Sequence, residues 1–259
     1  MRQLFWSTPI LILLWAATAC QNPATDDSSN DEGIVSETPS EPDTPVTLPP
    51  PPPPLPDTSD LERELISQGL VNILDYDSSV VVRMMYSTND NFLGEDVYAD
   101  YDECYLQPEV AQKLTKAEEL LIMAHPDLRL IVFDCVRPRS VQYQMWEIVK
   151  GTDQQRYVAA PGGSGSMHNY GAAVDLGLYH IDSGLVDMGT PFDFFGPLAQ
   201  PRYETQFLQS GELTQVQINH RAILRTAMKE AGFQGIMSEW WHFIGFGRDE
   251  VRSRYTIVE

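Results

Sequence analysis

The sequence predicts an α+β fold for a domain that occupies residues 57–259, with regular structure starting near Leu61. Segments with strand and helix patterns follow one another there in mixed order, without the regular alternation of a doubly wound sheet. No segment repeats at a fixed period. Hydrophobic residues make up 42% of the 259-residue chain, enough for the core of one sizeable domain or two small ones.

Three elements are expected in the first half of this domain. The segment 80–84 is short, and most of its residues are β-branched, as in a strand. Pro108 suits the first turn of a helix, and residues 128–133 have the composition of a buried strand. Along the helix that Pro108 begins, one apolar face is formed by Val110, Leu114, Ala117, Leu121 and Ala124.

Three more elements are expected in the second half. Residues 140–149 have a helical pattern, residues 172–178 alternate as a strand, and residues 217–230 form a helix that ends before Gly232. In the alternating strand, one face is formed by Val174, Leu176 and Leu178. Asp175 therefore lies on the opposite face, and its small neighbours there, Ala173 and Gly177, are expected to leave room for a metal ion.

The first twenty residues are expected to be a targeting segment. Arg2 gives a positive start, and residues 10–15 are apolar but too few to span a bilayer core of about 30 Å. Small residues at 16–19 directly precede Cys20, which is similar to a bacterial lipobox, where cleavage leaves a lipid-bearing cysteine. We therefore expect a lipoprotein signal peptide at residues 1–20. An ordinary cleaved signal is the alternative.

Residues 21–56 have the composition of a disordered tether. They contain eleven prolines and few large apolar residues, and a core cannot be built from such a segment. The predicted location is the periplasm or cell envelope, with the chain anchored to a membrane by its lipid alone. Gln21, next to the lipidated cysteine, weakly favours the outer membrane.

The charge argues against two classes of partner. The formal net charge of −20 argues against binding to nucleic acid and against direct docking on anionic lipid. The cysteines agree with an oxidising compartment: if Cys20 carries lipid, Cys104 and Cys135 remain as a pair that could form a disulfide. Two unrelated buried thiols are the alternative.

Two short segments carry the chemistry, residues 166–175 (SMHNYGAAVD) and residues 238–243 (SEWWHF). Together they offer His168, Asp175 and His242, the three-ligand set of a catalytic zinc site that keeps its fourth position for water. Taken alone, each segment has a simpler interpretation, as a histidine in a turn or as an aromatic core strand.

Glu239 is the natural general base for such a site, because a carboxylate beside the metal can take a proton from the attacking water. Glu239 and His242 are three residues apart and would point to opposite faces of an ideal strand. We therefore expect a bend or bulge between them.

The glycine-rich residues 162–165 lack a following lysine and a helix, so a phosphate-binding loop is not expected. No motif contains the other histidines, which are His125, His180 and His220.

At these residues the sequence resembles the D-alanyl-D-alanine dipeptidases of the VanX type. The two segments are similar to the family signatures SxHxxGxAxD and ExWH. Three further segments resemble family motifs in the family's order: residues 86–94 (YSTNDNFLG), 134–138 (DCVRP) and 188–193 (MGTPFD). The resemblance implies an antiparallel sheet with flanking helices, in the zinc-peptidase fold that the family shares with D,D-carboxypeptidases and the hedgehog signalling domain.

The resemblance also implies roles for individual residues. His168, Asp175 and His242 would bind one Zn²⁺ per chain, and Glu239 would act as the base and later protonate the leaving amine. Arg137 would stabilise the oxyanion of the tetrahedral intermediate; a structural salt bridge is its other interpretation.

Ser166 and Asp193 would lie in the substrate pocket, where Asp193 would pair with the free ammonium of a dipeptide. The chain departs from the family at Val136, where tyrosine is usual, and at Met167 and Asn169 beside the first ligand. These departures concern substrate preference, because the ligands themselves are intact.

The expected function is hydrolysis of D-alanyl-D-alanine or a related small D,D-dipeptide during cell-wall turnover. A resistance enzyme would have to destroy the free dipeptide in the cytoplasm, where a chain with this signal is not expected. Two alternatives stay open: a D,D-carboxypeptidase acting on peptidoglycan stem peptides, and a zinc-binding module without catalysis.

Overall fold

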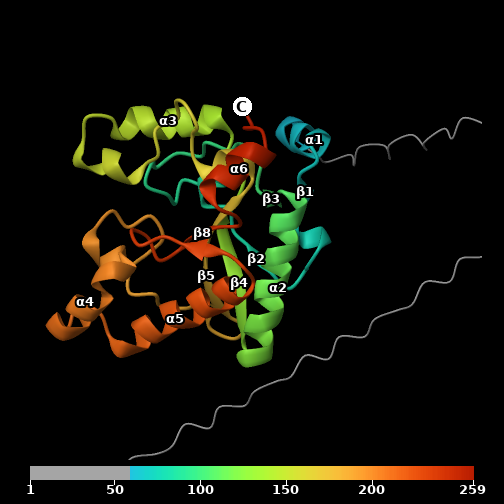
Figure 1. Ribbon diagram of the computed structural model, residues 1–259. Helices are drawn as coiled ribbons and strands as arrows, with labels where there is room; N and C mark the ends of the chain where they lie inside the picture. Colours follow the sequence, from blue (N-terminus) through green and yellow to red (C-terminus); the bar gives the residue numbers. More distant parts are fainter. Residues whose placement is uncertain (1–58) are drawn as a thin grey trace, which may run out of the picture. The chain divides into compact units, whose positions relative to one another are not determined.

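The computed structural model describes residues 59–259 (Figure 1). The predicted signal peptide (residues 1–20) and the whole predicted tether (residues 21–56) lie outside these residues. The first helix, α1 (Asp60–Ser67), begins at a capping box in which the Ser59 side chain accepts from the backbone of Glu62 and Glu62 accepts from the backbone of Ser59. Regular structure therefore starts where the hydrophobic pattern of the domain begins.

Most of the molecule is organised around a sheet of six strands (Figure 1). Five of the strands lie in the order β2-β4-β5-β8-β7, and β6 pairs with β5 beside this path. A separate two-stranded sheet pairs β1 with β3. The strands are β1 (Val71–Asn72), β2 (Val81–Val82), β3 (Tyr105–Leu106), β4 (Leu128–Asp134), β5 (Ala173–His180), β6 (Gly184–Leu185), β7 (Gln234–Gly235) and β8 (His242–Ile244).

The large sheet is mixed, whereas the sequence analysis expected an antiparallel one. The pairs β4-β5, β5-β8 and β7-β8 are antiparallel, as expected, but β2 runs parallel to β4. A parallel pair needs a long crossover between its strands, and here the chain from 83 to 127 provides one that includes α2. The predicted strand at residues 80–84 is confirmed only at Val81 and Val82.

Two long helices pack against each other beside the sheet, α2 (Pro108–Ala124) and α5 (Gln215–Glu230), and both confirm the sequence prediction. Pro108 occupies the first turn of α2, and the predicted apolar face is buried except for Ala124, which is exposed at the helix end. The remaining helices are α3 (Arg139–Val149), α4 (Glu204–Ser210) and α6 (Arg248–Arg254). Short 3₁₀ helices are η1 (Ile73–Asp75), η2 (Met85–Ser87), η3 (Asp153–Tyr157), η4 (Met167–Tyr170), η5 (Pro197–Ala199) and η6 (Pro201–Tyr203).

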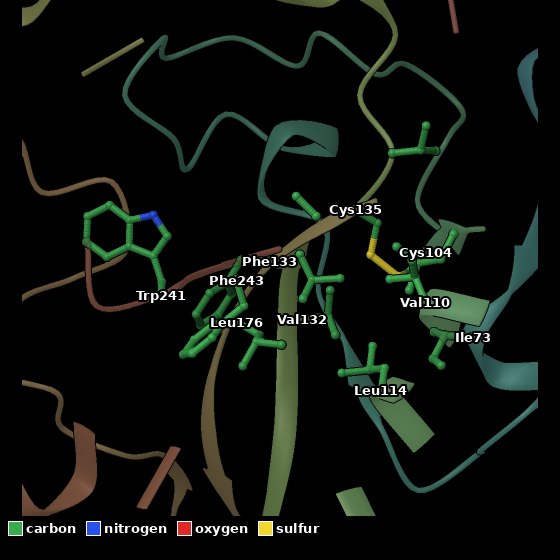
Figure 2. Packing of buried hydrophobic residues seen from close by; sticks show 14 of the residues in the cluster. Ile73, Cys104, Val110, Leu114, Val132, Phe133, Cys135, Leu176, Trp241 and Phe243 are labelled. Atoms are coloured by element: carbon green, nitrogen blue, oxygen red, sulfur yellow. A yellow bond between two sulfur atoms is a disulfide. The ribbon is translucent and has the colours of Figure 1, made fainter. Parts of the chain in front are cut away.

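The core lies between α2 and the sheet and continues across the aromatic residues near β8 (Figure 2). A disulfide joins Cys104, directly before β3, to Cys135, directly after β4, with 5.4 Å between their Cα atoms. It lies close to Val110 in Figure 2, at the first turn of α2. The covalent link therefore fixes the end of β4 to the edge of the smaller sheet.

Strand β5 confirms the predicted strand from Ala173 onward, but one expectation about it is wrong. A Cβ atom at Gly177 would lie 3.1 Å from the ring of Phe133 and 3.6 Å from that of Trp240. The space beside Gly177 is thus filled by aromatic rings and is not the room for a metal ion that we expected. Among residues 59–259, no helix is both long enough and apolar enough to cross a membrane.

Candidate metal centre

Three adjacent strands bring the acidic and imidazole groups of the site together. Asp175 of β5 is paired with His242 of β8 on one side and with Asp134 of β4 on the other. The register of β4 shifts between Val132 and Asp134, so the end of this strand departs from regular pairing there.

His168 comes from outside the sheet, on the short helix η4. Its position depends on two local features. Ser166 caps η4 in a capping box with Asn169, and Gly171 ends it with a φ of 63°, a backbone conformation that glycine adopts without strain. A Cβ at position 171 would also lie 2.7 Å from the side chain of Leu70. The loop therefore holds the histidine at the end of the sheet, where Asp175 and His242 lie.

The three side chains fit a tetrahedral metal ion. His168 Nε2 lies 3.1 Å from His242 Nδ1 and 3.4 Å from an oxygen of Asp175, and His242 Nδ1 lies 2.8 Å from the other oxygen. Ligands about 2.0–2.1 Å from a tetrahedral metal lie about 3.3 Å from one another. All three residues are buried. Within residues 59–259, they form a cluster whose side-chain atoms could bind a metal ion together.

The tautomer of His168 is set by the backbone. Its Nδ1 donates to the carbonyl oxygen of Cys135 at 2.7 Å, so the neutral imidazole carries its proton there and turns the lone pair of Nε2 toward the cluster. The carboxyl of Asp175 is buried, which acts to raise its pKa, but the imidazoles of His168 and His242 outweigh this and hold the pKa below its usual range. The cluster therefore presents an ionised carboxylate and two imidazole nitrogens, the donor set that zinc and similar divalent ions prefer.

Glu239 lies in the irregular segment that precedes β8, so the chain bends between Glu239 and His242, as expected. Its side chain is partly buried and lines the same pocket as the metal ligands. Burial raises the pKa of Glu239 to about 7; the nearby carboxylates of Asp175 and Asp193 act in the same direction, and His242 opposes them. A carboxyl with a pKa near neutrality can both accept and return a proton, as a general base and acid must.

Arg137 lines this pocket and is held in place by hydrogen bonds and an ion pair. Its Nε donates to Asp134 at 2.9 Å, its Nη1 donates to Gln142 at 2.9 Å, and its Nη2 lies 3.8 Å from Asp175. Burial acts to lower the pKa of Arg137, but the carboxylate of Asp134 outweighs it and the pKa is raised. The two interpretations of Arg137 therefore apply together: it forms a salt bridge, and it presents a fixed positive charge to the pocket.

Asp193 is brought to the pocket by a loop in which it adopts a positive φ of 57°. The phenol of Tyr86 donates to its carboxylate at 2.5 Å. Burial raises the pKa of Asp193 to about 8, and the hydrogen bond from Tyr86 opposes that rise. Ser166 lies in the same pocket and accepts from the backbone N–H of His168 at 3.3 Å, so its own hydroxyl proton can be donated elsewhere.

The pocket has a volume of about 250 Å³, below the range of roughly 300–1,000 Å³ that drug-sized ligands occupy. Aromatic side chains from three segments form one of its walls. The ring of Phe195 stacks on Tyr157 with 5.2 Å between centroids and packs edge-on against Phe92 at 4.8 Å. This wall leaves space for a small substrate.

The structure brings together all seven residues that the sequence assigned to metal, catalysis and substrate. His125, His180 and His220 lie outside the cluster, and the last two interact with nearby backbone. Three residues that support the site, Tyr86, Asp134 and Gln142, were not identified from the sequence. Tyr86 and Asp134 lie in the segments 86–94 and 134–138 that resemble family motifs, and this membership was a usable signal. Gln142 lies in no such segment.

This fold and this cluster define a class of protein. A family model described as D-ala-D-ala dipeptidase matches residues 67–258, and the chain belongs to this family of metal-dependent peptidases.

Individual relatives agree with the family. The D-alanyl-D-alanine dipeptidase of Escherichia coli K12 is 28% identical over 162 residues, covering 62% of this chain and 77% of the relative. The D-alanyl-D-alanine dipeptidase of Enterococcus faecium is 30% identical over 175 residues, covering 61% and 82%. That of Enterococcus faecalis is 30% identical over 182 residues, again covering 61% and 82%.

Proposed function

We propose that the protein is a zinc dipeptidase that hydrolyses D-alanyl-D-alanine or a closely related D,D-dipeptide. The observation that carries this proposal is the buried cluster of His168, Asp175 and His242, which shares one small pocket with Glu239 and Arg137. Two imidazoles and one carboxylate suit one Zn²⁺ per chain and leave a fourth position for water. A zinc ion held there would acidify water and polarise the scissile carbonyl.

The side chains around the cluster supply the remaining chemistry. Glu239, with its pKa of about 7, takes the proton of the attacking water and returns it to the leaving amine. Arg137 is pre-organised by Asp134 and Gln142, so its charge is already in place when the oxyanion develops. Both roles require only the protonation states that the pocket favours.

Asp193 determines the length of the substrate. It lies in the pocket with a phenolic donor, and its carboxylate can pair with the free ammonium of a dipeptide. A stem peptide has an amide at this point and offers no such cation. The aromatic wall of Phe92, Tyr157 and Phe195 further restricts the space beyond it.

A comparison of substrates tests this assignment. The zinc-loaded protein is incubated with D-Ala-D-Ala, with N-acetyl-D-Ala-D-Ala and with a pentapeptide stem, and release of D-alanine is measured. We expect turnover of the free dipeptide alone, and an Asp193→Asn variant should lose about 10–100-fold in kcat/KM for it. Preferential turnover of the stem would instead assign a D,D-carboxypeptidase. Zinc binding without turnover of any of the three would assign a non-catalytic module.

We further propose that residues 1–20 are a lipoprotein signal peptide and that residues 21–56 tether the enzyme to a membrane of the cell envelope, with the outer membrane favoured by Gln21. The support is the small residues before Cys20 and the proline-rich composition that follows. In this location the substrate would come from cell-wall turnover. The protein should sediment with membranes, and Cys20→Ala should move it to the soluble fraction or leave the signal uncleaved. A Cys20→Ala protein that has lost its signal and still sediments with membranes would contradict the lipid anchor.

A further inference from the structure

Most arginine side chains of residues 59–259 are paired with carboxylates. Nine of the twelve form an ion pair: Arg63, Arg83, Arg129, Arg137, Arg139, Arg221, Arg225, Arg252 and Arg254. Within this described part, Arg156, Arg202 and Arg248 have no carboxylate partner. Two of these three, Arg156 and Arg248, line the pocket of the metal centre.

The two arginines reach the pocket from different elements. Arg156 lies in η3, and its guanidinium carbon is 5.3 Å from the ring centroid of Tyr157, a residue of the aromatic wall. Arg248 begins α6, which packs against η4, the element that carries His168. Both arginines are exposed, so an anion that enters the pocket can reach them without displacing another residue.

Among the arginines of residues 59–259, those without a carboxylate partner are a minority. The chain has 37 acidic residues against 17 basic ones, and acidic side chains partner most of the arginines even at the surface. In the pocket the third arginine, Arg137, is already engaged by Asp134. The pocket therefore contains acidic groups that suit an ammonium, and in addition two arginines whose hydrogen-bond donors are free to bind a carboxylate.

We infer that Arg156 and Arg248 bind the C-terminal carboxylate of the substrate, so that the enzyme requires a free carboxylate on the residue after the scissile bond. This inference rests on the proposed function and extends it. An arginine fork donates two parallel hydrogen bonds to a carboxylate. A dipeptide zwitterion then has its two charges recognised by separate groups, the ammonium by Asp193 and the carboxylate by the arginines, and the peptide bond is aligned between them.

Binding of two ligands tests the inference apart from turnover. The zinc-loaded full chain carrying Glu239→Gln, which blocks turnover, is titrated by calorimetry with D-Ala-D-Ala and with its C-terminal amide. Arg156→Gln and Arg248→Gln should each weaken binding of the free acid about tenfold and leave binding of the amide unchanged. Arg202→Gln is the matched control: its guanidinium donates to the carbonyl oxygen of Met237, it does not line the pocket, and it should change neither affinity.

The outcomes separate this inference from the proposed function. Two results would overturn the carboxylate assignment: equal affinity of the Glu239→Gln protein for the acid and the amide, or equal losses of affinity for both ligands in the arginine variants. Either result would do so even if the protein with intact Glu239 turns over D-Ala-D-Ala. Arginine-dependent binding of the acid, without turnover by the protein with intact Glu239, would support the assignment and overturn the dipeptidase function. Absence of binding of either ligand would overturn both.

Discussion

At the residue scale, the site is built from groups whose neighbours set their protonation. Asp175 stays ionised because two imidazoles face it, Arg137 stays charged because Asp134 pairs with it, and Glu239 titrates near neutrality because it is partly removed from water. These states match the roles of ligand, oxyanion partner and base. A pocket in which such states coincide is a strong indication of a catalytic site.

The hydrogen bond between Tyr86 and Asp193 gives a prediction for pH dependence. Burial raises the pKa of Asp193 to about 8, and Tyr86 opposes the rise. The carboxyl is charged only above its pKa, so binding of the ammonium is lost as the pH falls through this value. Tyr86→Phe removes the opposing hydrogen bond and should move the acid limb of kcat/KM upward by about one pH unit.

The kcat profile serves as an internal control for this prediction. In the bound state Asp193 is paired with the ammonium, so the acid limb of kcat reports Glu239 and should not move. Tyr143→Phe, at a tyrosine that is 49% exposed outside the pocket, should leave both profiles unchanged. If the pH profile of kcat/KM is the same for Tyr86→Phe and for the unsubstituted protein, the proposed role of Asp193 is contradicted.

At the element scale, the disulfide connects stability to metal binding. Cys104 and Cys135 are 31 residues apart, and the carbonyl of Cys135 orients His168. Replacing both cysteines by alanine should lower the free energy of unfolding by about 3–4 kcal/mol, because the unfolded chain regains the entropy of that loop. It should also weaken zinc binding about 10–100-fold, since groups that orient metal ligands have effects of this size.

Two measurements check the disulfide prediction: denaturant unfolding of the metal-free protein and competition for zinc with a chromophoric chelator. Chemically reduced protein with both cysteines present is the control, because it lacks the link and keeps the side chains. Loss of stability with unchanged zinc affinity would show that the carbonyl of Cys135 is held in place without the disulfide.

The loop that ends η4 makes a second prediction at this scale. Gly171→Ala combines a positive φ with a Cβ that would lie 2.7 Å from Leu70, whereas Gly211→Ala, with a φ of 79°, meets no atom within 4 Å. Both substitutions strain the backbone, but only the first also forces packing to shift. We expect Gly171→Ala to cost about 1–3 kcal/mol more than Gly211→Ala in thermal unfolding. Equal costs would mean that Leu70 moves aside freely.

The sequence predicted the elements that have a clear period. Strand β5 was recognised because the large apolar residues Val174, Leu176 and Leu178 alternate with other residues in the sequence, and helices α2, α3 and α5 because their apolar residues recur at helical spacing. Strands β7 and β8 were missed because they are two and three residues long, too short for a period to emerge. The parallel pairing of β2 could not be predicted either, since it depends on where the crossover through α2 returns.

At the scale of the whole molecule, the candidate ligands were predictable and their supporting contacts were not. His168, Asp175 and His242 stand in recognisable motifs, so their meeting in space could be expected. The contact between Tyr86 and Asp193 joins residues 107 positions apart, and Gln142 supports Arg137 from a helix that carries no catalytic motif. Such contacts follow from packing of the complete fold.

We propose that the His168–Asp175–His242 cluster, loaded with zinc, makes this chain a D,D-dipeptidase. The most direct test is to remove metal with a chelator, restore zinc in steps and follow D-alanine release from D-Ala-D-Ala, with Glu239→Gln and L-Ala-L-Ala as controls. We expect activity that reaches its plateau at one zinc per chain, on the D,D-dipeptide alone, and a loss of at least about 100-fold in Glu239→Gln despite full zinc occupancy. Zinc-independent activity, or full activity in Glu239→Gln, would show that this cluster is not the catalytic centre.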